Sequence, residues 1–308
     1  MTPLLRVGDL PKVHGKLIED ADMSGLTWLR VGGPADVLFL PANEDDLAGV
    51  LSALPSDIPV TIVGVGSNLL VRDGGVRGLV VRLGPGFATV AVEDMTVTAG
   101  AAALDAQVAK TAARAGIAGL EFLRGVPGTI GGALKMNAGA YGTETKDVLD
   151  HARGVNRSGA IVDVPVDEMG FSYRHSEPPD DLIFVQAVFS GQPGTVHDIE
   201  ERMADIMQRR EGSQPIKEKT GGSTFANPDI VDTGGKKAWQ LIDLIGGRGR
   251  SVGDAQVSEQ HCNFMINRGK ATARDFECLI EGLRKDVLNE TGIDLRWEIQ
   301  RIGEAAAA

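Results

Sequence analysis

Three polar residues, far apart in the sequence, carry side chains that together could do acid–base chemistry. Ser223 lies in the glycine-rich stretch GGSTFANP, Arg174 ends an FSYR segment, and Glu298 lies in an LRWEIQRIG segment. A serine hydroxyl can deliver a proton, and the planar guanidinium of arginine matches a carboxylate. A glutamic acid whose pKa is raised can hydrogen-bond the same carboxylate oxygens. Brought together, the three side chains could protonate and stabilise an enolate.

Two glycine-rich stretches have the composition of ligand-binding loops. In GVGSN, Gly64 and Gly66 can take backbone angles closed to other residues, so successive N–H groups can converge on a pyrophosphate. A plain turn between strands would explain this stretch as well, and Leu69 occupies the place of the third Rossmann glycine. The second stretch, GVPGTIGGALKMNAGAYG, is more specific, because a proline stiffens it and its apolar residues require burial. Two such loops could clamp one dinucleotide.

The composition indicates a globular, multi-lobed chain that binds a ligand. At 308 residues it exceeds the usual size of a single core, so we expect two or three lobes. Its 40 glycines and 5% aromatic residues suggest many close approaches of backbone to ligand. A net charge of -11 argues against a nucleic-acid surface, which needs a basic field. The chain shows neither a secretory h-region nor an uninterrupted apolar run of membrane-spanning length, so we expect a cytoplasmic protein without membrane insertion.

The cysteines and histidines do not form a metal-binding pattern. The two cysteines, Cys262 and Cys278, are too few for a disulfide framework or a four-thiolate site, and we expect both to be reduced and buried. His261 has no cysteine or histidine at metal-ligand spacing. A hydrogen-bonded structural role and a functional role remain equally open for His261. We therefore expect no metal.

Hydrophobic periodicity predicts alternating strands and helices. We expect strands over 35–40 and 59–63 around a helix containing Leu47 and Leu54, and a hairpin that turns at Glu93 and Asp94. Further expected elements are a helix over 103–115, a hairpin at 157–159, a buried strand over 182–190 and a helix over 196–210. A domain boundary is expected near Gly212.

The C-terminal region is predicted to hold one long helix and a final strand. The helix begins at Thr272, with Asp275 completing a variant capping box, and ends at Gly292. Its apolar stripe is expected to face inward and consists of Phe276, Leu279, Ile280, Leu283 and Val287. The strand is expected to run from Ile293 to Ile302 and to carry Glu298.

Seven motifs in order give the chain a resemblance to one family. The sequence runs GVGSNLLV, GVPGTIGGALKMNAGAYG, FSYR, GGSTFANP, AWQLID, VSEQHCNFMIN and WEIQRIG. This order resembles the UDP-N-acetylenolpyruvoylglucosamine reductases of peptidoglycan synthesis, the MurB flavoenzymes, over nearly the whole chain. The short link between the 157–159 hairpin and FSYR is similar to the branch without an extra substrate-capping loop.

The resemblance implies an α+β fold with three parts. These are a two-subdomain FAD-binding fold of the vanillyl-alcohol-oxidase (PCMH) type and a following α/β substrate-binding domain. Mapped onto this chain, residues 1–83 with 296–308 form the first FAD-binding subdomain, 84–211 the second, and 212–295 the substrate-binding domain.

The resemblance also implies a reaction and a set of site residues. The expected reaction is FAD-dependent reduction of UDP-N-acetylglucosamine enolpyruvate to UDP-N-acetylmuramate by NADPH, with hydride passing through flavin N5. Arg174, Ser223 and Glu298 are the expected catalytic residues, with Ser223 the proton donor and the other two stabilising the enolate. Expected substrate contacts are Tyr173, Asn227 and His261. Expected FAD contacts are Gly64, Gly66, Ser67, Asn68, Gly128, Thr129, Gly131, Gly132, Asn137 and Ala138.

One residue departs from the family pattern, and other functions stay open. The family often has lysine before the Asn-Pro of the serine loop, where this chain has Ala226. Five cations could replace the missing charge near the phosphates: Lys217, Lys219, Lys236, Arg248 and Arg250. Taken singly, Ser223, Arg174 and Glu298 are more often a turn residue, a surface ion-pair partner and a solvated strand residue. The alternatives are a flavin oxidase of a small hydroxy acid or alcohol, or an inactive flavin or UDP-sugar binding protein.

Overall fold

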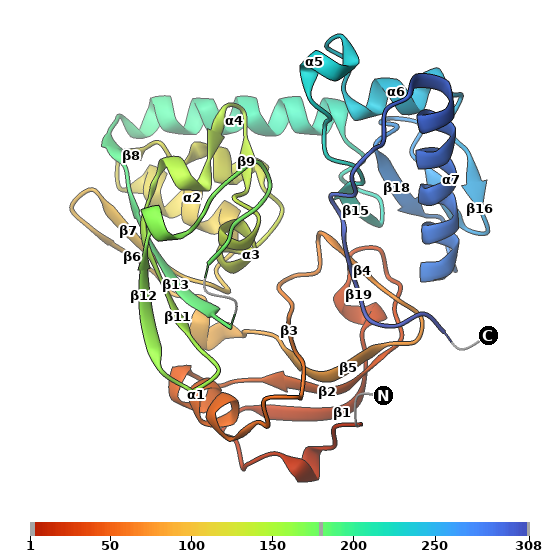
Figure 1. The fold of residues 1–308 in the computed structure, drawn as a ribbon. Coiled ribbons are helices and arrows are strands. Elements are labelled where there is room, and N and C mark those ends of the chain that lie inside the picture. The colour runs from red at the N-terminus through yellow and green to blue at the C-terminus, as the bar shows by residue number, and fades with distance from the viewer. Residues whose placement is uncertain (1–3, 179–180, 307–308) are drawn as a thin grey trace. The chain divides into compact units, whose positions relative to one another are not determined.

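The computed structural model describes residues 4–178 and 181–306, which form two compact units (Figure 1). Unit 1 contains the chain up to Glu19, Asp36–Gly64 and Gly78–Arg209. Unit 2 contains Asp20–Ala35, Val65–Arg77 and the chain from Arg210 onward. The division into three domains stays a prediction, and the outermost residues of its first subdomain, 1–3 and 307–308, lie outside the described residues.

The first sheet has four strands in the order β1–β2–β5–β3. Its strands are β1 (Lys16–Asp22), β2 (Pro34–Leu40), β3 (Val60–Ile62) and β5 (Val76–Val81). Helix α1 (Glu44–Ala53) begins at Asn43, whose side chain accepts a hydrogen bond from the Asp46 N–H and so caps the helix. The apolar face of α1 joins the same core cluster as Phe39 and Leu79, which is how this strand–helix–strand segment buries itself. The predicted strand–helix–strand unit is confirmed.

The second sheet has five antiparallel strands in the order β12–β11–β13–β7–β6. They are β6 (Val90–Glu93), β7 (Thr96–Gly100), β11 (Leu149–Val155), β12 (Ile161–Pro165) and β13 (Ile183–Ser190). Helices α2 (Asp105–Arg114) and α3 (Ile130–Lys135) cover one face of this sheet (Figure 1) and share its apolar core. The glycine-rich segment from Gly119 to Gly142 thus contains a short 3-10 helix (Glu121–Gly125), helix α3 and a two-residue strand, and α3 packs on the core of this sheet.

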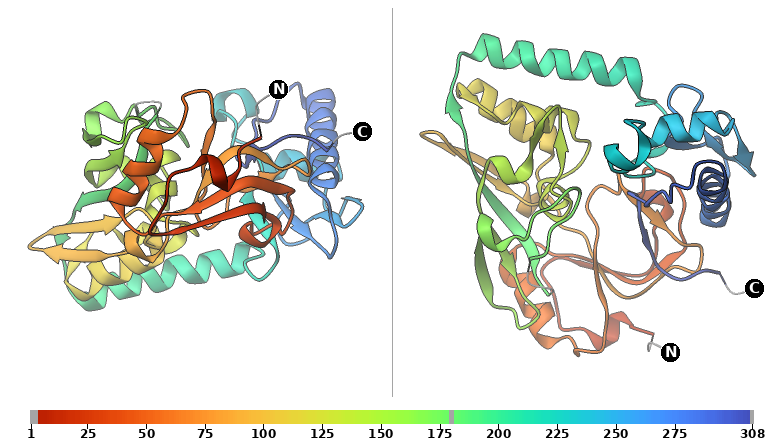
Figure 2. Two further views of the ribbon diagram at one scale, coloured as in Figure 1. Left: turned by 90° about the horizontal axis from the view of Figure 1, so that it is seen from below. Right: turned by 45° about the horizontal axis from the view of Figure 1, so that its top comes forward.

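Short pairings complete unit 1. Strands β8 (Ile117–Ala118) and β14 (Gln192–Pro193) pair, as do β9 (Gly139–Ala140) and β10 (Thr143–Glu144). Helix α4 (Val196–Ser213) follows as one unbroken helix in both views of Figure 2 and packs on the unit 1 core with Ile199 and Met203. The predicted hairpins at Asp94 and at 157–159 are confirmed, and so is the helix after the buried strand.

Unit 2 is built around a four-stranded sheet in the order β15–β18–β17–β16. Its elements are β15 (Thr220–Ser223), α5 (Ile230–Thr233), α6 (Ala238–Leu244), β16 (Ser251–Val252), β17 (Ala255–Val257), β18 (Phe264–Asn267) and α7 (Ala273–Thr291). A separate parallel pair joins β4 (Leu69–Val71) to β19 (Gln300–Ile302). The long helix matches its prediction, with a capping box between Thr272 and Asp275 and Gly292 in the left-handed conformation at φ +75°.

Two predictions for this region are wrong in part. The predicted final strand is regular only at β19, because residues 293–299 bond to several loops instead of one ladder, so Glu298 precedes the strand. Cys262 is buried as predicted, but Cys278 is exposed. Position 278 falls off the apolar stripe of α7, which explains its exposure.

No helix among the described residues is both long and apolar enough to cross a bilayer. The same residues contain no cluster of three or more metal-ligating side chains.

Candidate functional site

The Ser223 loop leaves the end of β15 in a conformation fixed by a buried asparagine. Gly222 has φ +79°, which only glycine adopts easily, and it turns the chain out of the strand. The Asn263 side chain, on a residue 4% exposed, accepts from the Phe225 N–H (2.9 Å) and donates to the Phe225 carbonyl (2.8 Å). The Asn263 carbonyl also accepts from the Thr224 N–H (2.7 Å). These three bonds fix the backbone directly after Ser223.

Glu298 is bonded to the same loop on one side and to the first glycine-rich stretch on the other. Its N–H donates to the Thr224 carbonyl (2.8 Å), and the Ala226 N–H donates to the Arg296 carbonyl (2.9 Å), so the two segments pair like antiparallel strands. The Asn68 side chain donates to the Glu298 carbonyl (3.1 Å). The structure therefore brings Ser223, Glu298 and Asn68 together within unit 2.

Arg174 lies on a tight turn in unit 1. Ser172 and His175 close the turn with reciprocal backbone hydrogen bonds of 3.0 and 3.3 Å. Arg174 has φ +57°, an unusual conformation for a residue with a side chain. Its guanidinium donates to the Gly139 carbonyl (2.8 Å) and stacks on the Tyr173 ring, 5.1 Å from the centroid. These contacts place Arg174 and the half-exposed Tyr173 beside the end of the second glycine-rich stretch.

Asn137 connects that glycine-rich stretch to the Arg174 turn. The side chain is fully buried and donates to the Ser172 carbonyl and to the Glu144 carboxylate, both at 3.0 Å. Its amide oxygen accepts from the Lys146 N–H (3.1 Å). The predicted contact of Asn137 with FAD stays a prediction, but the structure gives its amide a clear role in holding the loop and the turn together.

The two glycine-rich stretches approach each other closely at the Thr129 hydroxyl. A Cβ added at Gly64 would lie 2.9 Å from Thr129 Oγ1, and one added at Gly132 would lie 3.9 Å from the same atom. Gly64 therefore permits a close approach to the buried Thr129 that a side chain would prevent. Gly66 has a different role: at φ +69° it packs directly against the carbonyl of Leu26, so a side chain there would clash with the backbone.

Asp105 is a residue near this loop that sequence reasoning missed. It is fully buried at the start of α2, and its N–H donates to the Gly128 carbonyl (3.2 Å). Burial raises the pKa of its carboxyl well above the usual value, against a smaller opposing effect of the Gly128 backbone. An isolated aspartate at a helix start reads as an ordinary cap, so its burial has no local sequence signal.

The two remaining predicted substrate contacts lie in unit 2. The Asn227 side chain accepts from the Ala238 N–H (3.2 Å), which helps begin α6. His261 Nδ1 accepts from the Asn263 N–H (3.2 Å), which leaves the proton on Nε2 of the neutral ring. Burial lowers the pKa of His261. His261 thus supports the residue that holds the Ser223 loop, while its ligand contact stays a prediction.

The structure also describes the surroundings of Ala226. This residue is 4% exposed. Of the five cations predicted to replace the family lysine, Arg248 is paired with Asp243 (3.0 Å) and Arg250 with Asp286 (2.7 Å). Lys236 lines a shallow hollow of about 370 Å³ beside Trp239.

Comparisons with known proteins identify the family of this chain. A family model described as "FAD binding domain" matches residues 35–165, and one described as "UDP-N-acetylenolpyruvoylglucosamine reductase, C-terminal domain" matches residues 214–302. A protein of Azorhizobium caulinodans named UDP-N-acetylenolpyruvoylglucosamine reductase is 57% identical over 96% of this chain and 94% of its own. One of Paramagnetospirillum magneticum with the same name is 58% identical over 96% and 94%. The chain belongs to the UDP-N-acetylenolpyruvoylglucosamine reductase family.

A solved structure supports the membership. The crystal structure of the reductase from Thermus caldophilus, MurB, aligns with a TM-score of 0.81 at 34% identity and covers 95% of this chain and all of that one. The family resemblance, the FAD-binding fold and the assignment as an oxidoreductase of this kind are therefore confirmed. The FAD-binding match includes both glycine-rich stretches, and the C-terminal match includes Ser223 and Glu298, whereas Arg174 falls between the two.

Proposed function

We propose that this reductase reduces the enolpyruvyl group of its UDP-sugar substrate with NADPH, using Ser223 as the proton donor and Arg174 and Glu298 to stabilise the enolate. The observation that carries the proposal is the bonding of Ser223's loop to Glu298 through Thr224, because a proton donor and a carboxyl group are then fixed on one scaffold. When bound, FAD takes hydride from NADPH and supplies it to the substrate. Thr129 and the glycine backbone at 64 and 132 would hold this cofactor, since the two glycine-rich stretches come together there.

The chemistry of the substrate explains why these three side chains are needed. An enolpyruvyl ether is electron-rich at its methylene carbon, so hydride can add there only if the adjacent carboxylate withdraws charge as an enolate. The Arg174 fork matches this carboxylate, and the acid form of Glu298 would donate to the same oxygens. Ser223 would then give its proton to the carbon beside the carboxylate. A serine can do this because the developing carbanion is a strong base.

The proposed substrate contacts accompany the proposed catalytic residues. Tyr173 shares the turn of Arg174. Asn227 and His261 belong to unit 2, as Ser223 does. A negatively charged chain that binds a UDP-sugar and NADPH must neutralise their phosphates with local cations, for which Lys217, Lys219 and Lys236 are the proposed residues. Arg248 and Arg250 are already engaged with acidic partners.

The test separates the two half-reactions. In anaerobic stopped-flow measurements on the FAD-loaded Ser223→Ala variant, NADPH should bleach the oxidised-flavin absorbance at a rate within about twofold of the unmodified protein. Reoxidation by UDP-N-acetylglucosamine enolpyruvate should slow by about 10²–10⁴-fold, the usual contribution of a general acid. Ser158→Ala, which changes a serine in the β11–β12 hairpin, is the matched control. Equal loss of both half-reactions in Ser223→Ala would refute the assigned role.

A further inference from the structure

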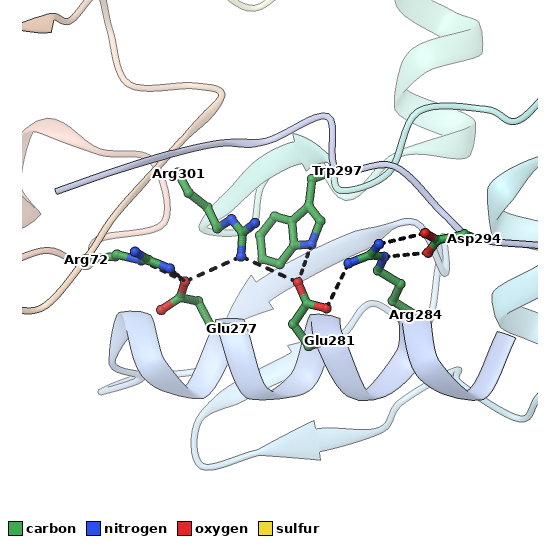
Figure 3. Close-up of polar contacts among 7 residues, drawn as sticks. All are labelled: Arg72, Glu277, Glu281, Arg284, Asp294, Trp297 and Arg301. Carbon is green, nitrogen blue, oxygen red and sulfur yellow. Dashed lines mark hydrogen bonds and ion pairs between the residues drawn. The ribbon is translucent and has the colours of Figure 1, made fainter. Parts of the chain in front are cut away.

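A row of alternating charges joins helix α7 to the segment that carries Glu298 (Figure 3). We call it the α7 ladder. All of its members belong to unit 2: Arg72, Glu277, Glu281, Arg284, Asp294, Trp297 and Arg301.

At the centre of the α7 ladder, Glu281 contacts Trp297 and Arg301, which lie just before and shortly after Glu298 in the sequence. The indole N–H of Trp297 donates to Glu281 Oε1 (2.8 Å). The Arg301 guanidinium lies 4.2 Å from the centroid of the Trp297 ring and 3.5 Å from the same Glu281 oxygen. One carboxylate and one ring therefore fix both side chains, since a guanidinium over an indole face is also favourable.

The ends of the α7 ladder anchor the segment further. Arg72 approaches Glu277 Oε1 with two nitrogens, at 2.8 and 2.9 Å, and Arg301 lies 3.7 Å from that oxygen. Arg284 forms a bidentate pair with Asp294, both contacts at 2.7 Å, and reaches Glu281 Oε2 at 3.3 Å. The segment from Asp294 to Arg301 is thus attached to α7 at its two ends and near its middle.

This attachment fixes the backbone on both sides of Glu298. Trp297 and Arg301 point toward α7 in Figure 3, and Ile299 is buried in the core cluster that contains the apolar stripe of that helix. Glu298 lies between these anchored residues, and its backbone bonds to other segments: its N–H donates to the Thr224 carbonyl, and its carbonyl accepts from the Asn68 side chain.

Stability alone does not account for the α7 ladder. Most of its charged side chains are a third or more exposed, and water screens such ion pairs so that each contributes little. Glu277 and Glu281 are like charges at i and i+4, an unfavourable spacing on a helix unless a cation lies between them. Arg301 is that cation, so the arrangement makes sense as a means of fixing Arg301 and its neighbours.

We propose that Glu281 and Arg301 are positioning residues for Glu298. By holding the side chains of Trp297 and Arg301 against α7, they keep the backbone of Glu298 in place where it bonds to the Ser223 loop. The proposal rests on the proposed function, which makes Glu298 a group that acts on the enolate.

The main test compares two acidic residues on the same helix. Glu281→Gln removes the acceptor charge of the α7 ladder, whereas Asp286→Asn breaks the exposed pair with Arg250, which does not involve the 294–301 segment. Small displacements of a catalytic group cost up to about a hundredfold in rate. We expect Glu281→Gln to slow flavin reoxidation at saturating enolpyruvyl substrate by about tenfold, with substrate affinity and reduction by NADPH within about twofold. Asp286→Asn should leave all three unchanged.

A second variant covers the case in which Glu281→Gln fails to fold. Arg301→Lys keeps the charge but loses the planar stacking on Trp297, and it should slow reoxidation in the same selective way. Equal effects of Glu281→Gln and Asp286→Asn, or a parallel loss of the NADPH half-reaction, would overturn the proposal.

Glu298→Ala distinguishes failure of the positioning proposal from failure of the proposed function. If Glu298→Ala slows reoxidation and neither Glu281→Gln nor Arg301→Lys does, only the positioning role is wrong. If Glu298→Ala itself leaves reoxidation unchanged, the proposed role of Glu298 fails, and the positioning role fails with it.

Discussion

The Arg174 turn and the Ser223 loop differ in the kind of contacts that hold them. Each depends on a buried asparagine, Asn137 for the turn and Asn263 for the loop. The Ser223 loop has two further supports, the strand-like pairing with the Glu298 segment and the bond from Thr224 to the backbone of Asn263. The Arg174 turn closes on itself through Ser172 and His175, and its other bonds to unit 1 run through side chains, from Arg174 to the Gly139 carbonyl and from Ser176 to the Lys135 carbonyl.

The difference indicates two ways of placing a catalytic group. The Ser223 loop is held redundantly, as expected of a proton donor that must lie within hydrogen-bond reach of one carbon atom. Arg174 instead takes an unfavourable backbone conformation on a turn that is bonded to the rest of unit 1 through side chains, and strain of this kind persists at functional positions. A guanidinium binds a carboxylate over a wider range of positions, so looser support is sufficient.

After Ser223→Ala, removing the Arg174 side chain should produce the largest effect, and it should leave the fold intact. Arg174→Gly loses the proposed partner of the enolate, so reoxidation by the enolpyruvyl substrate should slow by about 10²–10³-fold, the cost of one oxyanion donor. Because glycine relieves the conformation at φ +57°, Arg174→Gly should unfold at higher urea concentration than Arg174→Ala, by about 1 kcal/mol in free energy. If Arg174→Gly is less stable than Arg174→Ala, the turn is not strained.

The two asparagines test the difference in support directly. Asn137→Ala and Asn263→Ala each leave buried backbone groups without a partner and should each lower the free energy of unfolding by about 2–4 kcal/mol. The loss of reoxidation rate should be larger for Asn137→Ala, because the Ser223 loop keeps its other supports. Asn137→Gly controls for the positive φ of that residue. A greater loss of rate in Asn263→Ala would reverse the comparison.

The smallest expected effect is a pH dependence of stability that comes from His261. Burial lowers the pKa of His261 in the folded chain below its ordinary value of 6.5. As the pH falls below 6.5, the unfolded chain therefore binds a proton at this residue more readily than the folded chain does. Stability should therefore fall as the pH drops below 6.5, modestly because the ring is partly exposed. His261→Gln, which keeps an acceptor and does not titrate, should show a flatter dependence of the urea midpoint between about pH 5 and 7. Identical slopes would rule out the contribution of His261.

Local patterns could be predicted from the sequence, and contacts between distant segments could not. The ends of α7 were predictable because the capping box and the terminal glycine act within a few residues. The glycine-rich stretches and the seven motifs identified the family and the candidate residues. The roles of Asn137 and Asn263 were not visible, because each is defined by carbonyls that only the fold brings near.

The Glu298 segment shows why the prediction of a strand was only partly correct. Its alternating apolar residues are those of a strand, and the segment is extended and alternates as expected. Its partners, however, come from the Ser223 loop, Asn68 and β4 in turn, so a regular ladder forms only at β19. The burial of Asp105 has a similar cause, since α2 begins under the Gly128 loop only in the folded chain.

The pairing of β19 with β4 has a consequence for the timing of protein synthesis. Residues near 300 must align beside residues near 70, and the Ser223 loop is completed by the same late segment. A ribosome releases the N-terminal part first, at about 5–20 residues per second, so β4 leaves the ribosome many seconds before its partner β19 is made. The proposed proton donor and its neighbouring carboxyl can therefore be assembled only after almost the entire chain has been made, which prevents a truncated product from acting on the substrate.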